Sequence, residues 1–192
     1  MANDHDLLLE LQTGSLEALG QLYDHHHRMV FRTALGITCD ADAAADLLQD
    51  VFLRLHRFSD HVDPDRPLEP WLYRMTANLA YSWVKRSSRW LCPFEEITDW
   101  LANARRSLVH EAVELDEDWQ SVSQAISTLP VQQRVVIVLY YINGLSLQEI
   151  AEILAVPTGT VKSRLYYGRE TLKKTLGIVS NERLSDLQCE FT

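Results

Sequence analysis

The chain has 192 residues, of which 46% are hydrophobic and 23% charged, and its formal net charge is −9. This length allows one medium-sized domain or two small ones, and the composition is that of a soluble globular protein. No apolar run approaches the ~18 residues that cross a bilayer, and the opening "MANDHDLLLELQ" has acidic residues where a signal peptide has basic ones. The three cysteines are widely spaced and predict neither a disulfide framework nor a CxxC metal site. We therefore expect a cytoplasmic protein without membrane insertion.

Two short stretches are basic although the chain as a whole is acidic. Residues 74–89 contain four basic side chains and no acidic one, and residues 158–176 contain five basic side chains against Glu170 alone. A basic patch in each half of the chain indicates two local surfaces for a polyanion, set in an acidic body.

The first half of the chain predicts amphipathic helices. In the stretch 15–38, apolar residues recur at helical intervals, namely Leu16, Leu19, Leu22, Tyr23, Val30, Ala34 and Leu35. The stretch 39–58 opens with acidic residues, which favour a helix N-terminus, and its predicted buried face consists of Leu47, Val51, Leu55 and Phe58. Its other faces carry Asp46, Gln49, Asp50 and Leu53, which suits either a partner-binding surface or a solvated one.

Three consecutive histidines, within "DHHHR" at 24–28, invite a metal-site interpretation. Successive side chains on a helix point about 100° apart, so at most two of the three could share one ion. We favour a solvated helix face here and predict no metal and no other cofactor.

An irregular loop with three prolines, at 59–70, precedes an aromatic and basic helix at 71–90. Aromatic rings among cations beside a loop suit unpaired bases, because rings stack on bases and cations hold phosphates. The aromatic residues are Trp71, Tyr73, Tyr81, Trp83 and Trp90, and the basic ones are Arg74, Lys85, Arg86 and Arg89. Much of the core under this helix is expected from Leu72, Met75, Leu79 and Val84.

The second half predicts helices up to Gly144. One amphipathic helix is indicated by Trp119, Val122, Ile126 and Leu129. The run "LPVQQRVVIVLYYING" has strand-forming residues, but its length of ~13 residues, Pro130 at its start and Gly144 at its end favour a helix. We expect Tyr140 and Tyr141 to lie in the core and on its flank, and residues 115–176 to form a compact four-helix unit.

A helix-turn-helix is predicted at 145–174. Ser146 and Glu149 have the spacing of a capping box, and Leu147, Ile150, Ala151 and Leu154 follow on one apolar face. After "AVPT", a second helix has a buried stripe of Val161, Leu165, Leu172 and Leu176 and an outer face of Gly159, Lys162, Ser163, Tyr166, Arg169 and Lys173. An ordinary αα-hairpin with a solvated face is the alternative, but the cap, turn, stripe and basic face all agree with a helix that enters the major groove of DNA.

Three blocks in this order make the chain resemble a bacterial extracytoplasmic-function (ECF) sigma factor, a small class of RNA polymerase sigma subunit. The blocks contain "DLLQDVFLR", "PWLYRMTANLA" and "GTVKSR", and the resemblance covers roughly residues 10–176. It implies an all-α fold of two small helical domains joined by a linker. Domain 2 would span 1–90, an acidic linker 91–114, domain 4 with its helix-turn-helix 115–177, and a C-terminal tail 178–192.

The resemblance also implies roles for individual residues. Core polymerase would be bound, through the clamp helices of its β′ subunit, by Asp46, Gln49, Asp50, Phe52 and Leu53. The −10 promoter element would be read and opened, with a flipped base captured, by Asp63, Arg66, Trp71, Arg74, Asn78, Lys85 and Arg86. The −35 element would be read by Thr158, Gly159, Thr160, Lys162, Ser163, Arg164, Tyr166 and Arg169. The β flap of the polymerase and an anti-sigma factor would be further partners.

The resemblance implies no catalytic residues, so the chain is not expected to be an enzyme. In this family basic residues are frequent near Ala77 and Tyr167, and many such turns have glycine where this chain has Ala155. Two other functions are alternatives: a helix-turn-helix regulator that binds an operator as a dimer, and a metal hydrolase built on the histidines. The first leaves 71–90 without a role, and the second lacks spaced ligand partners in the sequence.

Overall fold

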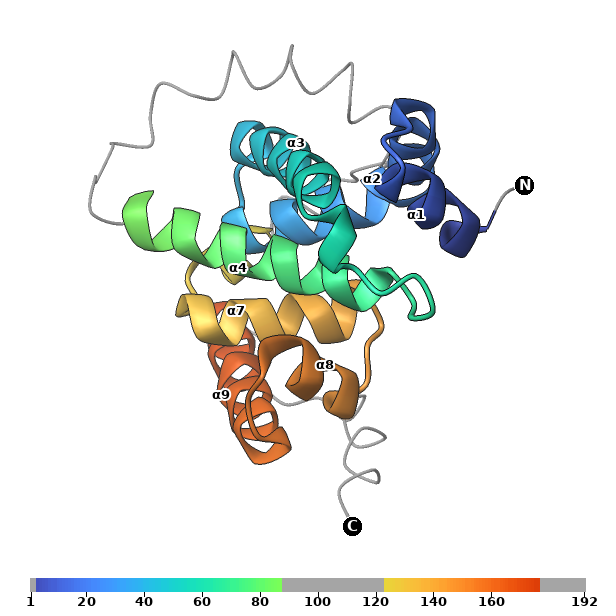
Figure 1. Cartoon of the computed structure of the whole chain (residues 1–192). Helices are drawn as coiled ribbons and strands as arrows, with labels where there is room; N and C mark the ends of the chain where they lie inside the picture. Colours follow the sequence, from blue (N-terminus) through green and yellow to red (C-terminus); the bar gives the residue numbers. More distant parts are fainter. Residues whose placement is uncertain (1–2, 88–122, 177–192) are drawn as a thin grey trace.

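A computed structural model describes residues 3–87 and 123–176, and all regular structure in these ranges is helical. The first range contains α1 (Asp4–Gln12), α2 (Leu16–Thr38), α3 (Ala41–Arg57), a 3₁₀ turn η1 (Ser59–His61) and α4 (Glu69–Ser87). The second contains a helical turn at 123–127, α7 (Val131–Ile137), a π-helical turn η2 (Val138–Ile142), α8 (Leu147–Leu154) and α9 (Thr158–Thr175). The predicted all-α fold of two helical units is confirmed (Figure 1). The predicted linker at 91–114 and tail at 178–192 lie outside the described residues.

The first unit packs around the long helix α2, which contacts α1, α3 and α4. Side chains cap the N-termini of two of its helices: the Ser15 hydroxyl accepts a hydrogen bond from the Ala18 amide at α2, and the Asp40 carboxylate accepts one from the Ala43 amide at α3. Leu47, Val51 and Leu55 of α3 are buried as predicted. Phe58 is not, because α3 ends at Arg57 and the chain turns away into η1, which leaves the Phe58 ring exposed.

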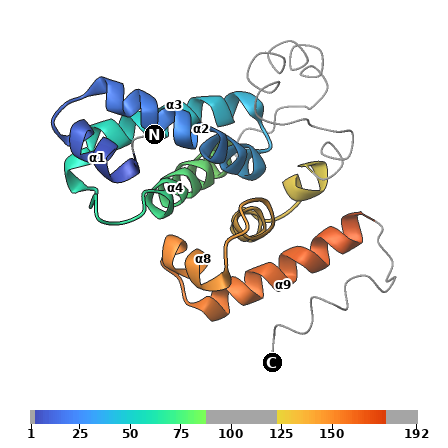
Figure 2. The ribbon, with the colours of Figure 1, turned by 90° about the vertical axis from the view of Figure 1, so that its right-hand side faces the viewer.

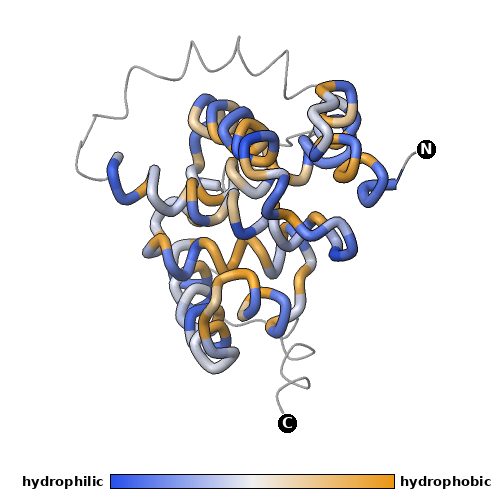
Figure 3. The backbone as a smooth tube through the Cα atoms, viewed as in Figure 1, coloured by the Kyte–Doolittle hydropathy of each residue, from blue (hydrophilic) through white to orange (hydrophobic). Residues whose placement is uncertain are grey.

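The second unit is centred on α7, whose last residues, 135–137, continue into η2 as an apolar run (Figure 3). The run of valines and isoleucines at 131–142 is helical, as predicted, and its last turn widens to a π-helix at η2. Gly144, with φ +71°, ends this helix, which agrees with its predicted cap role. Tyr140 packs against the core and Tyr141 is exposed. Trp119 and Val122 lie outside the described residues, whereas Ile126 and Leu129 are buried.

The two units share one continuous core. Helices α2 and α4 of the first unit contact α7, η2 and α8 of the second, and α4 lies alongside α7 in two perpendicular views (Figures 1 and 2). Arg134 of α7 is buried at this interface and donates to the backbone oxygens of Ile37, Ser127 and Leu129. Asn143 donates to the hydroxyl of Thr33 across the same interface. The described helices include none with the length and apolarity that a membrane span requires.

Candidate nucleic-acid interface

The turn between α8 and α9 has the geometry of a helix-turn-helix. The Ser146 hydroxyl accepts from the Glu149 amide and the Glu149 carboxylate accepts from the Ser146 amide, so the predicted capping box is present. The pKa of the Glu149 carboxyl is lowered by hydrogen bonding with the Ser146 hydroxyl and with the Ser146 backbone amide. Helix α8 ends at Ala155, whose φ of 51° lies in the left-handed region, and Pro157 precedes the first residue of α9. The sharp turn sets α9 at an angle that leaves one of its faces exposed.

The inner face of α9 packs on α7. Val161 and Leu165 are buried, as the predicted stripe requires. A Cβ on Gly168 would lie 3.0 Å from Cγ1 of Ile137, so the absence of a side chain there permits close packing of α9 on α7. The stripe is shorter than predicted: Leu172 is half-buried and Leu176 is exposed, because it lies beyond the end of α9.

The outer face of α9 collects most of the residues that the resemblance assigns to the −35 element. A shallow hollow on this face is lined by Gly159, Lys162, Ser163, Leu165, Tyr166, Tyr167 and Arg169. Thr158 and Thr160 lie half-buried in the first turn of the same helix. Tyr166 and Tyr167 are both exposed and form an edge-to-face pair with ring centres 5.4 Å apart. The exposed Lys162, Ser163 and Tyr166, together with the half-buried Arg169, suit contacts to base edges and phosphates.

Arg164, which was also predicted to contact the −35 element, does not line this hollow. Its side chain lines a second cleft, between the two units, together with Ala77, Asn78 and Tyr81 of α4 and with Gln132, Val135 and Leu154. The pKa of the Tyr81 hydroxyl is lowered by hydrogen bonds with Gln132 and Lys85 and, to a smaller extent, by the charge of Arg164. One residue predicted for the −35 element and one predicted for the −10 element, Asn78, therefore meet in a single cleft.

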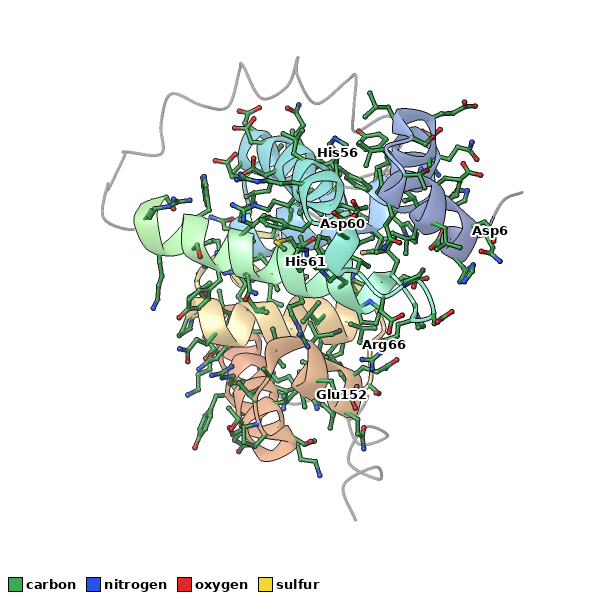
Figure 4. All side chains as sticks on the ribbon, in the orientation of Figure 1. Asp6, His56, Asp60, His61, Arg66 and Glu152 are labelled. Carbon is green, nitrogen blue, oxygen red and sulfur yellow. The ribbon has the colours of Figure 1, made fainter. Side chains whose placement is uncertain are left out.

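The loop before α4 is braced by α1. Nε2 of Gln12 donates to the backbone oxygens of Ser59 and Val62, at 3.0 and 2.9 Å. Beyond this brace, Asp63 and Arg66 form an exposed ion pair at 3.2 Å, of the kind that contributes little to stability. Arg66 projects from the loop, and Asp60 and His61 lie in η1 (Figure 4). The sequence does not predict these hydrogen bonds of Gln12, since the residues that accept them are 47 and 50 positions away.

Helix α4 presents the rest of the residues assigned to the −10 element. Asn78, Lys85 and Arg86 are exposed and Trp71 is half-buried against the core. Nζ of Lys85 lies 4.8 Å from the centre of the Tyr81 ring. Leu72 is buried, as predicted, and Met75, Leu79 and Val84 pack against the core from partly buried positions.

Arg74 of α4 is engaged by the second unit. Its Nη2 donates to the backbone oxygen of Glu152 at 2.8 Å, and its Nε donates to that of Ile153 at 3.0 Å. Both acceptors lie in the last turn of α8, where carbonyl groups lack intrahelical partners and attract a cation. Arg74 therefore holds the two units together in this arrangement and is not directed to solvent as an isolated cation.

Helix α3 presents an exposed surface of mixed acidic and apolar character. Asp46, Gln49 and Asp50 are exposed, and Leu53 has 63% of its surface exposed. An exposed leucine beside carboxylates suits a partner with an apolar pocket and a basic rim. Phe52, the remaining residue of the predicted set, is only 5% exposed, and its ring packs edge-to-face on Tyr23.

The histidine cluster also differs from the expected solvated face. His26 is buried, and Asp4 of α1 lies against both His25 and His26. Sequence spacing does not predict Asp4 as a partner of these histidines, because Asp4 is brought to them by the packing of α1 on α2.

Comparisons with known proteins agree with this architecture. The family model for sigma-70 region 2 matches residues 22–90, and that for sigma-70 region 4 matches residues 119–172. The chain is 31% identical over 179 residues to the ECF RNA polymerase sigma factor SigW of Bacillus subtilis, covering 87% of this chain and 93% of that protein. It is 30% identical over 179 residues to the ECF RNA polymerase sigma factor SigM of Mycobacterium tuberculosis, covering 93% of this chain and 87% of that protein.

Two solved structures have a similar fold. CnrH, in complex with the cytosolic domain of CnrY, superposes with a TM-score of 0.67 at 25% identity, covering 92% of this chain and 99% of that one. The sigma factor RpoE of Bartonella quintana, in complex with the anti-sigma factor NepR, gives a TM-score of 0.65 at 22% identity, covering 86% of this chain and 100% of that one.

Proposed function

The chain belongs to the ECF sigma factors of RNA polymerase, and on this premise we propose that it directs core polymerase to promoters by reading a −35 element with α9 and opening a −10 element with α4 and the loop before it. The observation that carries the proposal is the outer face of α9, where Gly159, Lys162, Ser163, Tyr166 and Arg169 line one exposed hollow directly after the turn. A conventional operator-binding regulator would use this face too, but that function would not explain why residues 22–90 match sigma-70 region 2.

The −35 contact is a major-groove contact in this proposal. The N-terminal part of the second helix of a helix-turn-helix lies nearest the base edges, and here that part contains Thr158, Gly159 and Lys162. Gly159 has open space where a Cβ would lie, so the DNA backbone or a base edge could approach the helix closely there. Arg169, two turns later, is placed for phosphate contact.

The −10 contact is a single-strand contact. Unstacking and flipping a base costs a few kcal/mol, which binding of the flipped base must offset. The Gln12 hydrogen bonds hold the start of the loop at 59–62 in a fixed shape, so little ordering free energy is lost when DNA binds. Lys85 and Arg86, exposed near the end of α4, would hold phosphates of the opened strand.

Promoter binding requires the two units to separate. The −10 and −35 elements are centred about 25 base pairs apart, which is about 85 Å of B-form DNA at ~3.4 Å per base pair. In the structure α4 touches α7 and α8 directly, and Asn78 and Arg164 share one cleft. We propose that this closed arrangement is that of the free chain, and that core polymerase exchanges the interface between the units for contacts of its own.

The exposed surface of α3 is the proposed contact with the clamp helices of β′, and the second unit is proposed to meet the β flap. The acidity of the chain is consistent with these contacts, because a net charge of −9 disfavours DNA binding by sigma alone and favours a basic protein partner.

RNA synthesis is assigned to the core enzyme, so the chain itself is proposed to have no catalytic activity and to act in the cytoplasm. An anti-sigma factor is a further proposed partner, since CnrH is seen with CnrY and RpoE with NepR.

The direct test is transcription in vitro. The purified chain would be added to sigma-free bacterial core polymerase with a pool of genomic promoters, and the transcripts would be sequenced. We expect defined start sites with shared elements about 10 and 35 bases upstream. No initiation with core from the matching source, together with a palindromic footprint in the absence of core, would replace the proposal with the operator-binding regulator.

A further inference from the structure

Three potential metal ligands from two helices meet at the N-terminal end of the molecule. Asp4 is the first residue of α1, and His25 and His26 lie in the middle of α2. Oδ1 of Asp4 is 3.0 Å from Nδ1 of His25, and Oδ2 is 2.6 Å from Nε2 of His26. The ligand atoms of all three residues lie within 4.8 Å of one another.

The use of different ring nitrogens explains how two neighbouring histidines reach one point. Adjacent side chains on a helix diverge by about 100°. His25 turns its Nδ1, the nitrogen nearer the backbone, toward Asp4, whereas His26 turns its outer Nε2 toward it. The carboxylate lies between the two rings and offers one oxygen to each.

The third histidine does not take part. Nδ1 of His27 lies 3.0 Å from the backbone oxygen of Tyr23, and its ring stacks on the Tyr23 ring with centres 5.1 Å apart. His27 is therefore a natural control for the other two, since it has the same chemistry in the next position of the same helix.

The donor set suits a borderline divalent cation. Zn²⁺ is bound by imidazole nitrogen and carboxylate oxygen at about 2.0–2.2 Å, commonly with three protein ligands and a water molecule. Ligand atoms within 4.8 Å of one another need only small side-chain movements to reach such distances.

The exposure of the three residues is also suitable. The His26 side chain is only 9% exposed, which fixes its ring, whereas those of His25 and Asp4 are 34% and 26% exposed. An ion could therefore enter from solvent and keep a water ligand on its open side.

We propose that Asp4, His25 and His26 form a binding site for one Zn²⁺ ion, which replaces the direct contacts between carboxylate and imidazoles and ties α1 to α2. The consequence reaches beyond the site because α1 is a brace. It buries Leu7, Leu8 and Leu11 in the core and holds the loop at 59–62 through Gln12. Zn²⁺ bound at the first turn of α1 would thus stabilise the segment that supports this loop.

The experiment is a Zn²⁺ titration of the full-length, metal-free chain against a chromophoric chelator, with Cys39, Cys92 and Cys189 changed to serine so that no thiol competes for the ion. We expect one equivalent to bind to this chain and to its His27→Gln variant. His26→Gln and Asp4→Asn should each weaken binding about 10-fold or more, as loss of a ligand does. Added Zn²⁺ should raise the Tm of the parent chain and of His27→Gln, and it should not raise the Tm of His26→Gln or Asp4→Asn.

Circular dichroism of each metal-free variant would establish that it is folded. If His26→Gln does not fold, the same Zn²⁺ titration is made with Asp4→Asn and His25→Gln, whose positions are more exposed, and both should bind Zn²⁺ more weakly. Co²⁺ provides an independent readout, since its visible absorption reports nitrogen and oxygen ligation without a sulfur charge-transfer band. Absence of stoichiometric binding, or equal binding by the Asp4, His26 and His27 variants, would overturn the proposal.

Discussion

Gly36 of α2 lies directly against Val138 of η2: a Cβ atom on Gly36 would lie 3.0 Å from Cγ2 of Val138 and 3.2 Å from Cδ1 of Ile142. The two residues belong to different helical units and are about one hundred positions apart in the sequence. The missing side chain permits the backbone of α2 to approach the second unit closely, and a side chain at this position would require Val138 and Ile142 to shift.

A valine at position 36 should force the two units apart. Its two methyl groups would overlap Val138 and Ile142 in a core with few voids, and such overpacking costs about 1–3 kcal/mol. We expect small-angle X-ray scattering of Gly36→Val to give a larger radius of gyration at unchanged helix content. Gly20→Ala is the matched control, because a Cβ there meets nothing within 4 Å. An unchanged radius would mean that the interface tolerates the added volume.

The reactivity of the Cys39 thiol is a second measure of the separation of the two units. Burial raises the pKa of its thiol, and its Sγ lies 3.6 Å from the backbone oxygen of Ser123 in the other unit. With Cys92 and Cys189 changed to serine, the rate of its reaction with a thiol reagent at pH 8 should be low in the parent chain and higher with Gly36→Val.

Removal of Arg134 should destabilise the whole described fold. The guanidinium is buried and donates to three backbone oxygens, of Ile37, Ser127 and Leu129, which would all lose this partner; the hydrogen bonds to Ile37 and Leu129 are buried. We expect Arg134→Ala to lower the free energy of unfolding by about 3 kcal/mol, measured by urea denaturation. Arg57→Ala, at an exposed position of α3, should change it little. A loss of less than 1 kcal/mol for Arg134→Ala would contradict the assignment of Arg134 as a buried tie between the units.

Glycine in place of Ala155 should stabilise the second unit. Ala155 has φ 51°, and the left-handed region costs a residue with a Cβ about 1–2 kcal/mol. Ala155→Gly removes this cost, and we expect a net gain of about 1 kcal/mol and a higher Tm. The control is Ala45→Gly in the interior of α3, for which the sign should reverse, since glycine costs about 1 kcal/mol in a helix. A lower Tm for Ala155→Gly would contradict this assignment of strain.

Charge reversal at Lys162 should weaken −35 recognition and leave polymerase binding intact. Lys162 lines the hollow on the outer face of α9, where a carboxylate would repel phosphates. We expect Lys162→Glu to weaken holoenzyme binding to a −35 probe by at least about 10-fold, since a single contact is worth ~1–3 kcal/mol, and to leave assembly with core unchanged. Lys174→Glu, at the far end of α9, should have a smaller effect. Unchanged promoter binding by Lys162→Glu would remove α9 from the −35 contact.

Charge reversal at Asp50 should weaken assembly with core polymerase. Asp50 is exposed on α3 beside the exposed Leu53, and its carboxylate would face a basic rim on the partner. We expect Asp50→Arg to raise the Kd for core severalfold, measured by fluorescence anisotropy of the labelled chain. Glu10→Arg, the same charge change on an exposed position of α1, is the control. Normal assembly of Asp50→Arg would exclude α3 from the interface.

The local chemistry of the sequence determined the helices and the residues that they present. The capping box of Ser146 and Glu149, the helical rather than strand conformation of 131–142, and the exposed outer face of α9 all follow from spacing over a few residues. Interactions of this range depend on helix geometry alone, which is why they could be predicted. Phe58 was predicted to be buried and is exposed, because helix periodicity places a side chain on a face but does not show where the helix ends.

Only the tertiary structure decided which distant groups meet. Arg74 and Arg164 are basic residues of predicted DNA surfaces, yet the packing of the two units turns both of them toward the interface between the units. Gln12 reaches Ser59, Arg134 reaches Ile37, and Asp4 reaches His25 and His26 over separations for which sequence spacing has no information. These contacts arise because burial of apolar surface fixes how whole helices pack, and polar partners then follow from that packing.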